Sequence, residues 1–72
     1  MAVWPNPVQR GQIVNIDFGT ALLTTLKLFD AKGTLITTRN VSGTVTELTA
    51  PGVPGQYILQ STNGLSVKII VE

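Results

Sequence analysis

The stretch Leu65-Ser66-Val67-Lys68-Ile69-Ile70-Val71-Glu72 decides the fold class of this 72-residue chain. Within it, Leu65, Val67, Ile69 and Val71 occupy every second position. Side chains of an extended strand alternate between two faces, so this period of two predicts a strand with one apolar face turned inward. The other face presents Ser66, Lys68, Ile70 and Glu72. The end of the chain is therefore expected to be the last strand of a β-sheet.

The same period recurs upstream of this stretch and predicts an all-β chain. The further predicted strands are Gln12–Phe18, Thr24–Asp30, Thr34–Asn40, Thr44–Thr49 and Gln56–Ser61. Their inward positions, with those of the terminal strand, predict a core of Val14, Ile16, Phe18, Leu26, Leu28, Tyr57, Leu59, Leu65, Val67, Ile69 and Val71. No segment carries a helical period that is long enough for a helix of ordinary length.

Turn residues separate these strands. Asn63-Gly64 predicts a tight hairpin of type I′, which needs a positive φ at both central residues. Asp30-Ala31-Lys32-Gly33 predicts a turn with Asp at its start and Gly at its end, and Pro51–Gly55 predicts a loop. About seven short, mainly antiparallel strands with patterned faces indicate an immunoglobulin-like β-sandwich that forms a single domain.

Two aromatic residues each allow two interpretations. Tyr57 stands where a loop becomes a strand, as does the tyrosine corner of immunoglobulin-like domains, in which the hydroxyl bonds to upstream backbone. It is otherwise an ordinary core aromatic. Trp4, beside two prolines, is either a platform for a sugar or an aromatic lid over one end of the domain. We favour the lid, because one tryptophan makes a poor sugar-binding surface.

The composition argues against catalysis. The chain has no histidine and no cysteine, which removes the usual general bases, thiol nucleophiles and transition-metal ligands. The four carboxylates are widely spaced, and the glycines form no phosphate-binding loop. Five basic residues in a chain of net charge +1 are too few for a nucleic-acid surface. We therefore expect no enzyme activity, no metal, no cofactor, no small-molecule substrate and no nucleic-acid partner.

Proline, glycine and aromatic motifs follow one another in a recognisable order. From the N-terminus they are Trp4-Pro5-Asn6-Pro7-Val8, Gly11, Leu26–Gly33, Val53–Leu59 and Ser66–Glu72. Taken together, they resemble the C-terminal sorting domain of cargo proteins exported by the type IX secretion system of Bacteroidetes. The resemblance covers essentially the whole chain, and it rests on the order and spacing of the motifs.

This resemblance implies that residues 1–72 form the C-terminal sorting domain of a larger secreted protein. In such proteins the domain is a secretion signal, read by the outer-membrane type IX translocon and its shuttle proteins after the cargo has entered the periplasm. A sortase-like peptidase then removes it in many members, upstream of the Pro-Asn-Pro segment, and the cargo stays at the cell surface or is released. From this resemblance together with the outward face of the terminal strand, the residues expected to take part in recognition are Pro5, Asn6, Pro7, Gly11, Gly33, Gly55, Tyr57, Lys68, Ile70 and Glu72.

The terminal strand has two interpretations under this hypothesis. An exposed edge with a free chain end is suited to strand pairing or end capture by a receptor. Alternatively, the strand only completes the core. An inert structural domain that only stabilises its neighbour also stays open, as does a different function, that of a carbohydrate-binding or adhesive β-sandwich module of an extracellular protein. That function would need two or more aromatic side chains on one exposed face.

Overall fold

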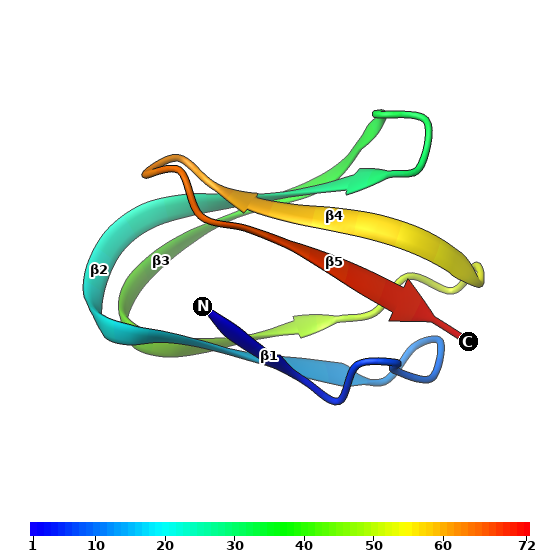
Figure 1. The fold of residues 1–72 in the computed structure, drawn as a ribbon, viewed down its shortest axis with the longest axis horizontal. Helices are drawn as coiled ribbons and strands as arrows, with labels where there is room; N and C mark the ends of the chain where they lie inside the picture. The colour runs from blue at the N-terminus through cyan, green and yellow to red at the C-terminus, as the bar shows by residue number, and fades with distance from the viewer.

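The computed structural model describes residues 1–72 and contains five strands and no helix (Figure 1). The strands are β1 (Ala2–Trp4), β2 (Ile13–Asp30), β3 (Leu35–Thr49), β4 (Gly55–Ser61) and β5 (Ser66–Val71). The all-β prediction is confirmed, whereas the number of strands is five rather than about seven. No helix is available that could cross a membrane.

The strand count is lower because two predicted strand pairs are continuous. The predicted strands Gln12–Phe18 and Thr24–Asp30 form the two ends of the 18-residue β2, which begins one residue later, at Ile13. Thr34–Asn40 and Thr44–Thr49 are likewise joined in the 15-residue β3, which begins at Leu35. The ladder between β2 and β3 changes register between Asp17 and Leu22 but does not stop there. The sequence pattern thus predicted correctly where each pair of predicted strands is interrupted. In the structure, the interruption is a bend within one strand and not a loop between two strands.

The bend curls one continuous sheet over itself. The strand order is β1-β2-β4-β5, and β3 pairs antiparallel with β2 along both of its halves. In Figure 1, β1 and the first part of β2 therefore lie below, and β4 and β5 lie above. We call these the lower and the upper layer. The architecture is a curled five-stranded sheet, and the predicted immunoglobulin-like sandwich of about seven strands is not confirmed.

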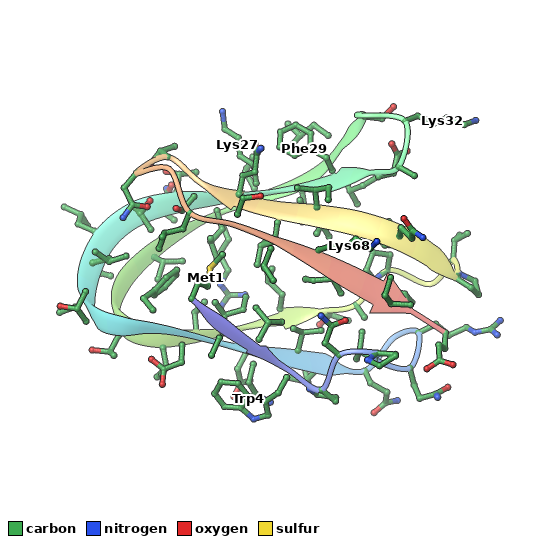
Figure 2. All side chains as sticks on the ribbon, in the orientation of Figure 1. Met1, Trp4, Lys27, Phe29, Lys32 and Lys68 are labelled. Atoms are coloured by element: carbon green, nitrogen blue, oxygen red, sulfur yellow. The ribbon has the colours of Figure 1, made fainter.

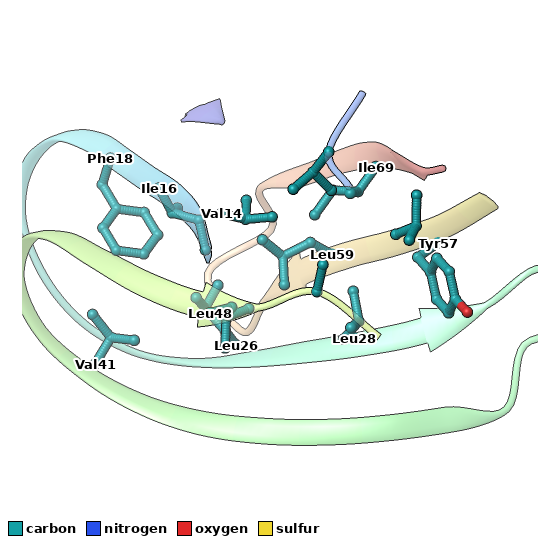
Figure 3. Close-up of a cluster of buried hydrophobic side chains, with 13 residues drawn as sticks. Val14, Ile16, Phe18, Leu26, Leu28, Val41, Leu48, Tyr57, Leu59 and Ile69 are labelled. Carbon is teal, nitrogen blue, oxygen red and sulfur yellow. The ribbon is translucent and has the colours of Figure 1, made fainter. Parts of the chain in front are cut away.

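The hydrophobic core fills the space between the two layers (Figure 3). Its members are Val8, Val14, Ile16, Phe18, Leu26, Leu28, Val41, Leu48, Ala50, Tyr57, Leu59, Ile69 and Val71. Every predicted core residue is among them except Leu65 and Val67, which are half-buried and pack against the cluster. Strand alternation thus identifies the inward face well wherever the strand itself was recognised.

The two hairpin turns share one construction. In the first, the N–H of Gly33 donates to the carbonyl of Asp30 at 3.0 Å, which confirms the predicted turn. In the second, the N–H of Gly64 donates to the carbonyl of Ser61 at 3.1 Å, so Thr62 and Asn63 are the central residues. Only glycines have a positive φ, and Gly64 has a φ of 96°. The predicted type I′ turn is therefore wrong, because a three-residue loop closed by a left-handed glycine replaces it.

Candidate functional site

The last strand, β5, lies at the end of the strand order, with β4 on one side. Residues Pro5–Arg10, which we call the N-terminal segment, cover its other side. The N–H of Val8 donates to the carbonyl of Ile70 at 2.9 Å, and the N–H of Glu72 donates to the carbonyl of Val8 at 2.8 Å. The N–H of Arg10 donates to the carbonyl of Glu72 at 2.9 Å. The N-terminal segment thus runs parallel to β5 and acts as a short additional strand.

Asn6 extends this pairing with its side chain. Its Nδ2 donates to the carbonyl of Lys68, and its Oδ1 accepts from the N–H of Ile70, both at 2.9 Å. An asparagine amide offers one carbonyl oxygen and an NH₂ group, as a peptide group offers one acceptor and one donor. Pro5 and Pro7 have no N–H to offer. The Asn6 side chain therefore takes the place of a strand peptide at this point, and we call these bonds together the clasp.

The clasp changes the expected character of the terminal strand. The backbone edge from the carbonyl of Lys68 to Glu72 is already paired, so the prediction of a free edge is wrong over this stretch. Strand pairing with a receptor at these residues would require the N-terminal segment to leave first. The outward side-chain face is as predicted, since Lys68 and Glu72 are exposed while Ile70 is half-buried.

A second group of predicted residues surrounds Tyr57. The Tyr57 hydroxyl donates to the carbonyl of Val53 at 2.6 Å, and its ring is buried. This bond to backbone four residues upstream confirms the interaction expected of a tyrosine corner. A Cβ at Gly55 would lie 3.9 Å from the Tyr57 ring. Asp30 pairs directly with Tyr57, which brings the hairpin that contains Gly33 beside the loop before β4.

Most of the predicted recognition residues converge at one end of the molecule, the right-hand end in Figure 1. There the C-terminus, the N-terminal segment and the loop before β4 come together. Gly11 joins this end through its N–H, which donates to the carbonyl of Ala50 at 3.2 Å. Gly33 lies in the exposed hairpin beside the loop before β4. Val8 and Arg10 also take part in the pairing, although the sequence analysis did not identify them.

The exposed Trp4 and the half-buried Phe29 do not share a face. Trp4 pairs with Asn15 on the lower layer, is 47% exposed, and points away from the core in Figure 2. It is not a lid over one end of the domain, so that prediction is wrong. Phe29 points outward from the upper layer on the opposite side of the molecule. The adhesive interpretation requires a shared aromatic face, and this arrangement does not provide one.

The polar groups at the clasp suit recognition by contact. They are an asparagine amide, paired backbone groups and the exposed side chains of Lys68 and Glu72. No three metal-ligating side chains come together in the structure.

Among known families, the secretion system C-terminal sorting domain matches residues 2–72. No curated protein and no solved structure matches the chain significantly.

Proposed function

Because the chain belongs to the secretion system C-terminal sorting domain family, we propose that it is the signal by which a larger cargo protein is handed to the type IX translocon. The family comprises sorting signals of type IX secretion and is not an enzyme family. The observation that carries this proposal is the family match, which extends over residues 2–72. In our proposal the domain ends the cargo chain and is bound by outer-membrane translocon and shuttle proteins. The cargo crosses the periplasm and reaches the cell surface or the medium.

The surface that these proteins bind is the clasp together with the outward side chains of β5. Asn6 and Val8 hold the two ends of the domain side by side. A receptor that contacts Lys68 and Glu72 therefore also lies close to the N-terminal segment. This arrangement explains physically why motifs at both ends of the chain would be needed for one signal.

Removal of the domain by a sortase-like peptidase is the second step of the proposal. Cleavage ahead of Ala2 leaves the domain whole, because β1 pairs with β2 through Ala2 and Asp17, Val3 and Ile16, and Trp4 and Asn15. Cleavage between Trp4 and Pro5 would detach a strand from the lower layer. We therefore place the cleavage upstream of β1, after which the cargo is attached to the surface or released.

Export of a reporter tests the proposal. Residues 1–72 are fused to the C-terminus of a periplasm-targeted fluorescent reporter in a bacterium with type IX secretion, and surface and periplasmic fractions are compared. The intact fusion should reach the surface. Lys68→Ala should lower export without lowering the melting temperature, because an exposed substitution usually changes stability by at most about 0.5 kcal/mol.

The control is Arg39→Ala, which also removes one positive charge at an exposed position, but on β3, outside the N-terminal segment and β5. Retention of the intact fusion in the periplasm would refute the sorting function. Export of the Lys68→Ala fusion at the level of the control would leave the sorting function standing and remove Lys68 from the recognised surface.

A further inference from the structure

The outer face of the upper layer combines lysines with apolar side chains. The buried residues Leu26, Leu28, Leu59 and Ile69 point into the core, so their neighbours in sequence point outward. We define the basic face by Lys27, Phe29, Gln56, Ile58, Gln60 and Lys68. Figure 2 shows Lys27 and Phe29 rising from this side of the sheet.

The strand register orders these residues into rows. Phe29 of β2 pairs with Ile58 of β4, which pairs with Lys68 of β5. In the next row, Lys27 pairs with Gln60. Phe29 and Ile58 are half-buried, and the two lysines are exposed. In these rows the two lysines occupy opposite corners, Ile58 and Gln60 lie between them, and Phe29 occupies a third corner. From the spacing of strands and residues, the lysine Cα atoms are about 12 Å apart.

The positive charge of this face is not balanced within it. None of the outward positions of β4, of β5 or of the second half of β2 is an aspartate or a glutamate. Two carboxylates flank the face: Glu72 lies four residues beyond Lys68 on the outward side of the terminal strand, and Asp30 lies in the hairpin, where its Oδ1 accepts from the N–H groups of Lys32 and Thr34 at 2.9 Å each. The face therefore complements a partner with negative charge at its ends and apolar side chains between them.

A hollow makes the face suitable for a polypeptide. It has a volume of about 420 Å³, and Phe29, Ile58, Gln56, Gln60 and the Asp30 hairpin line it. Glutamine amides both donate and accept hydrogen bonds, as a peptide backbone requires. A lipid surface would be better served by a flat face with many cations.

We propose that the basic face binds an extended segment of an export-machinery protein, with acidic residues four positions apart and apolar residues between them. Four residues of extended chain span about 13 Å, which matches the separation of the two lysines. This inference rests on the proposed function, and the basic face extends from Lys68, which it shares with the surface proposed above, across β4 to Lys27 and Phe29 of β2. The inference gives the outer face of the upper layer a binding role of its own, in addition to the role proposed for the motifs at the two ends of the chain.

Binding is tested with two synthetic peptides and the isolated 72-residue protein. The first is acetyl-Glu-Leu-Phe-Val-Glu-amide, and the second has lysine in place of both glutamates. Titration followed by amide NMR shifts should show that the acidic peptide perturbs Phe29 and Ile58. The binding of the lysine peptide should be roughly 2- to 30-fold weaker, because exposed ion pairs contribute about 0.2–1 kcal/mol each.

The variant Lys27→Glu/Lys68→Glu should reverse this preference. Its control, Arg10→Glu/Arg39→Glu, changes the net charge equally at exposed positions outside the basic face and should behave as the wild type. Equal binding of the two peptides, or shifts confined to other surfaces, would overturn the proposal. A membrane partner would also overturn the proposal. It would be indicated if the wild type co-sedimented with phosphatidylglycerol vesicles and the Lys27→Glu/Lys68→Glu variant did not.

The export assay distinguishes a failure of this inference from a failure of the proposed sorting function. If the wild-type fusion is exported, the Lys27→Glu fusion should be retained, whereas the Arg39→Glu fusion, whose equal charge change lies outside both the clasp and the basic face, should be exported. Export of all three fusions would overturn the role of the basic face and leave the sorting function intact. Retention of the wild-type fusion would instead refute the sorting function, and the peptide titration would still decide whether the face binds an acidic segment.

Discussion

Replacement of Asn6 by alanine should destabilise the domain out of proportion to the exposure of this side chain. The substitution removes two hydrogen bonds of 2.9 Å, one to the carbonyl of Lys68 and one from the N–H of Ile70. A typical hydrogen bond contributes about 0.5–1.5 kcal/mol net, and water can replace part of it at an exposed site. We therefore expect the free energy of unfolding to fall by about 1–2 kcal/mol. For a domain of this size, that loss lowers the melting temperature by roughly 4–16 °C.

Urea denaturation followed by circular dichroism measures this loss, and amide hydrogen exchange locates it. The exchange of the Ile70 amide should accelerate in Asn6→Ala more than that of the amides in β4. Asn40→Ala is the control, because this exposed amide only accepts one bond, from the Thr25 hydroxyl at 3.0 Å. If Asn6→Ala unfolds at the same urea concentration as Asn40→Ala, and the Ile70 amide stays protected, the clasp does not stabilise the terminal strand.

Three further substitutions test the packing and the turns by thermal or chemical denaturation. Phe18→Ala should cost about 3–5 kcal/mol, since the ring is buried beside the bend of the sheet, and an unchanged denaturation curve would contradict its place in the core. Tyr57→Phe should cost about 1 kcal/mol through loss of the bond to Val53, whereas equal stability would show that the hydroxyl bond contributes nothing. Gly64→Val should destabilise the last hairpin more than Asn63→Val does, because only Gly64 has a positive φ; the reverse order would restore the type I′ turn.

The fold was predictable where the signal is local. Alternation placed Val14, Leu26 and Ile69 on the buried face because a strand exposes this period directly in its sequence. The continuity of β2 was not predictable in this way. Gly19 has a φ of 79° and its N–H donates to the Asp17 carboxylate at 2.8 Å, which bends the chain while the ladder with β3 resumes at Leu22. Whether such a glycine ends a strand or bends it depends on the neighbouring strand, which the local pattern does not contain.

In the candidate site, likewise, local motifs identified single residues, but the contacts between residues far apart in the sequence could not be predicted. The family motifs marked Asn6 and Ile70, but nothing near either residue in the sequence indicates that they are joined, since 64 positions separate them. Val8 was missed for the same reason: it is an isolated apolar residue after two prolines, and it is buried only because β5 passes beside it. The edge of the last strand was predicted to be open because the sequence indicated no neighbour for this strand other than β4. Once the N-terminal segment is placed on that edge, the terminal strand can present its side chains to a receptor but not its paired backbone. Under the proposed function, recognition at the clasp is therefore made by side chains, unless the receptor first displaces Asn6.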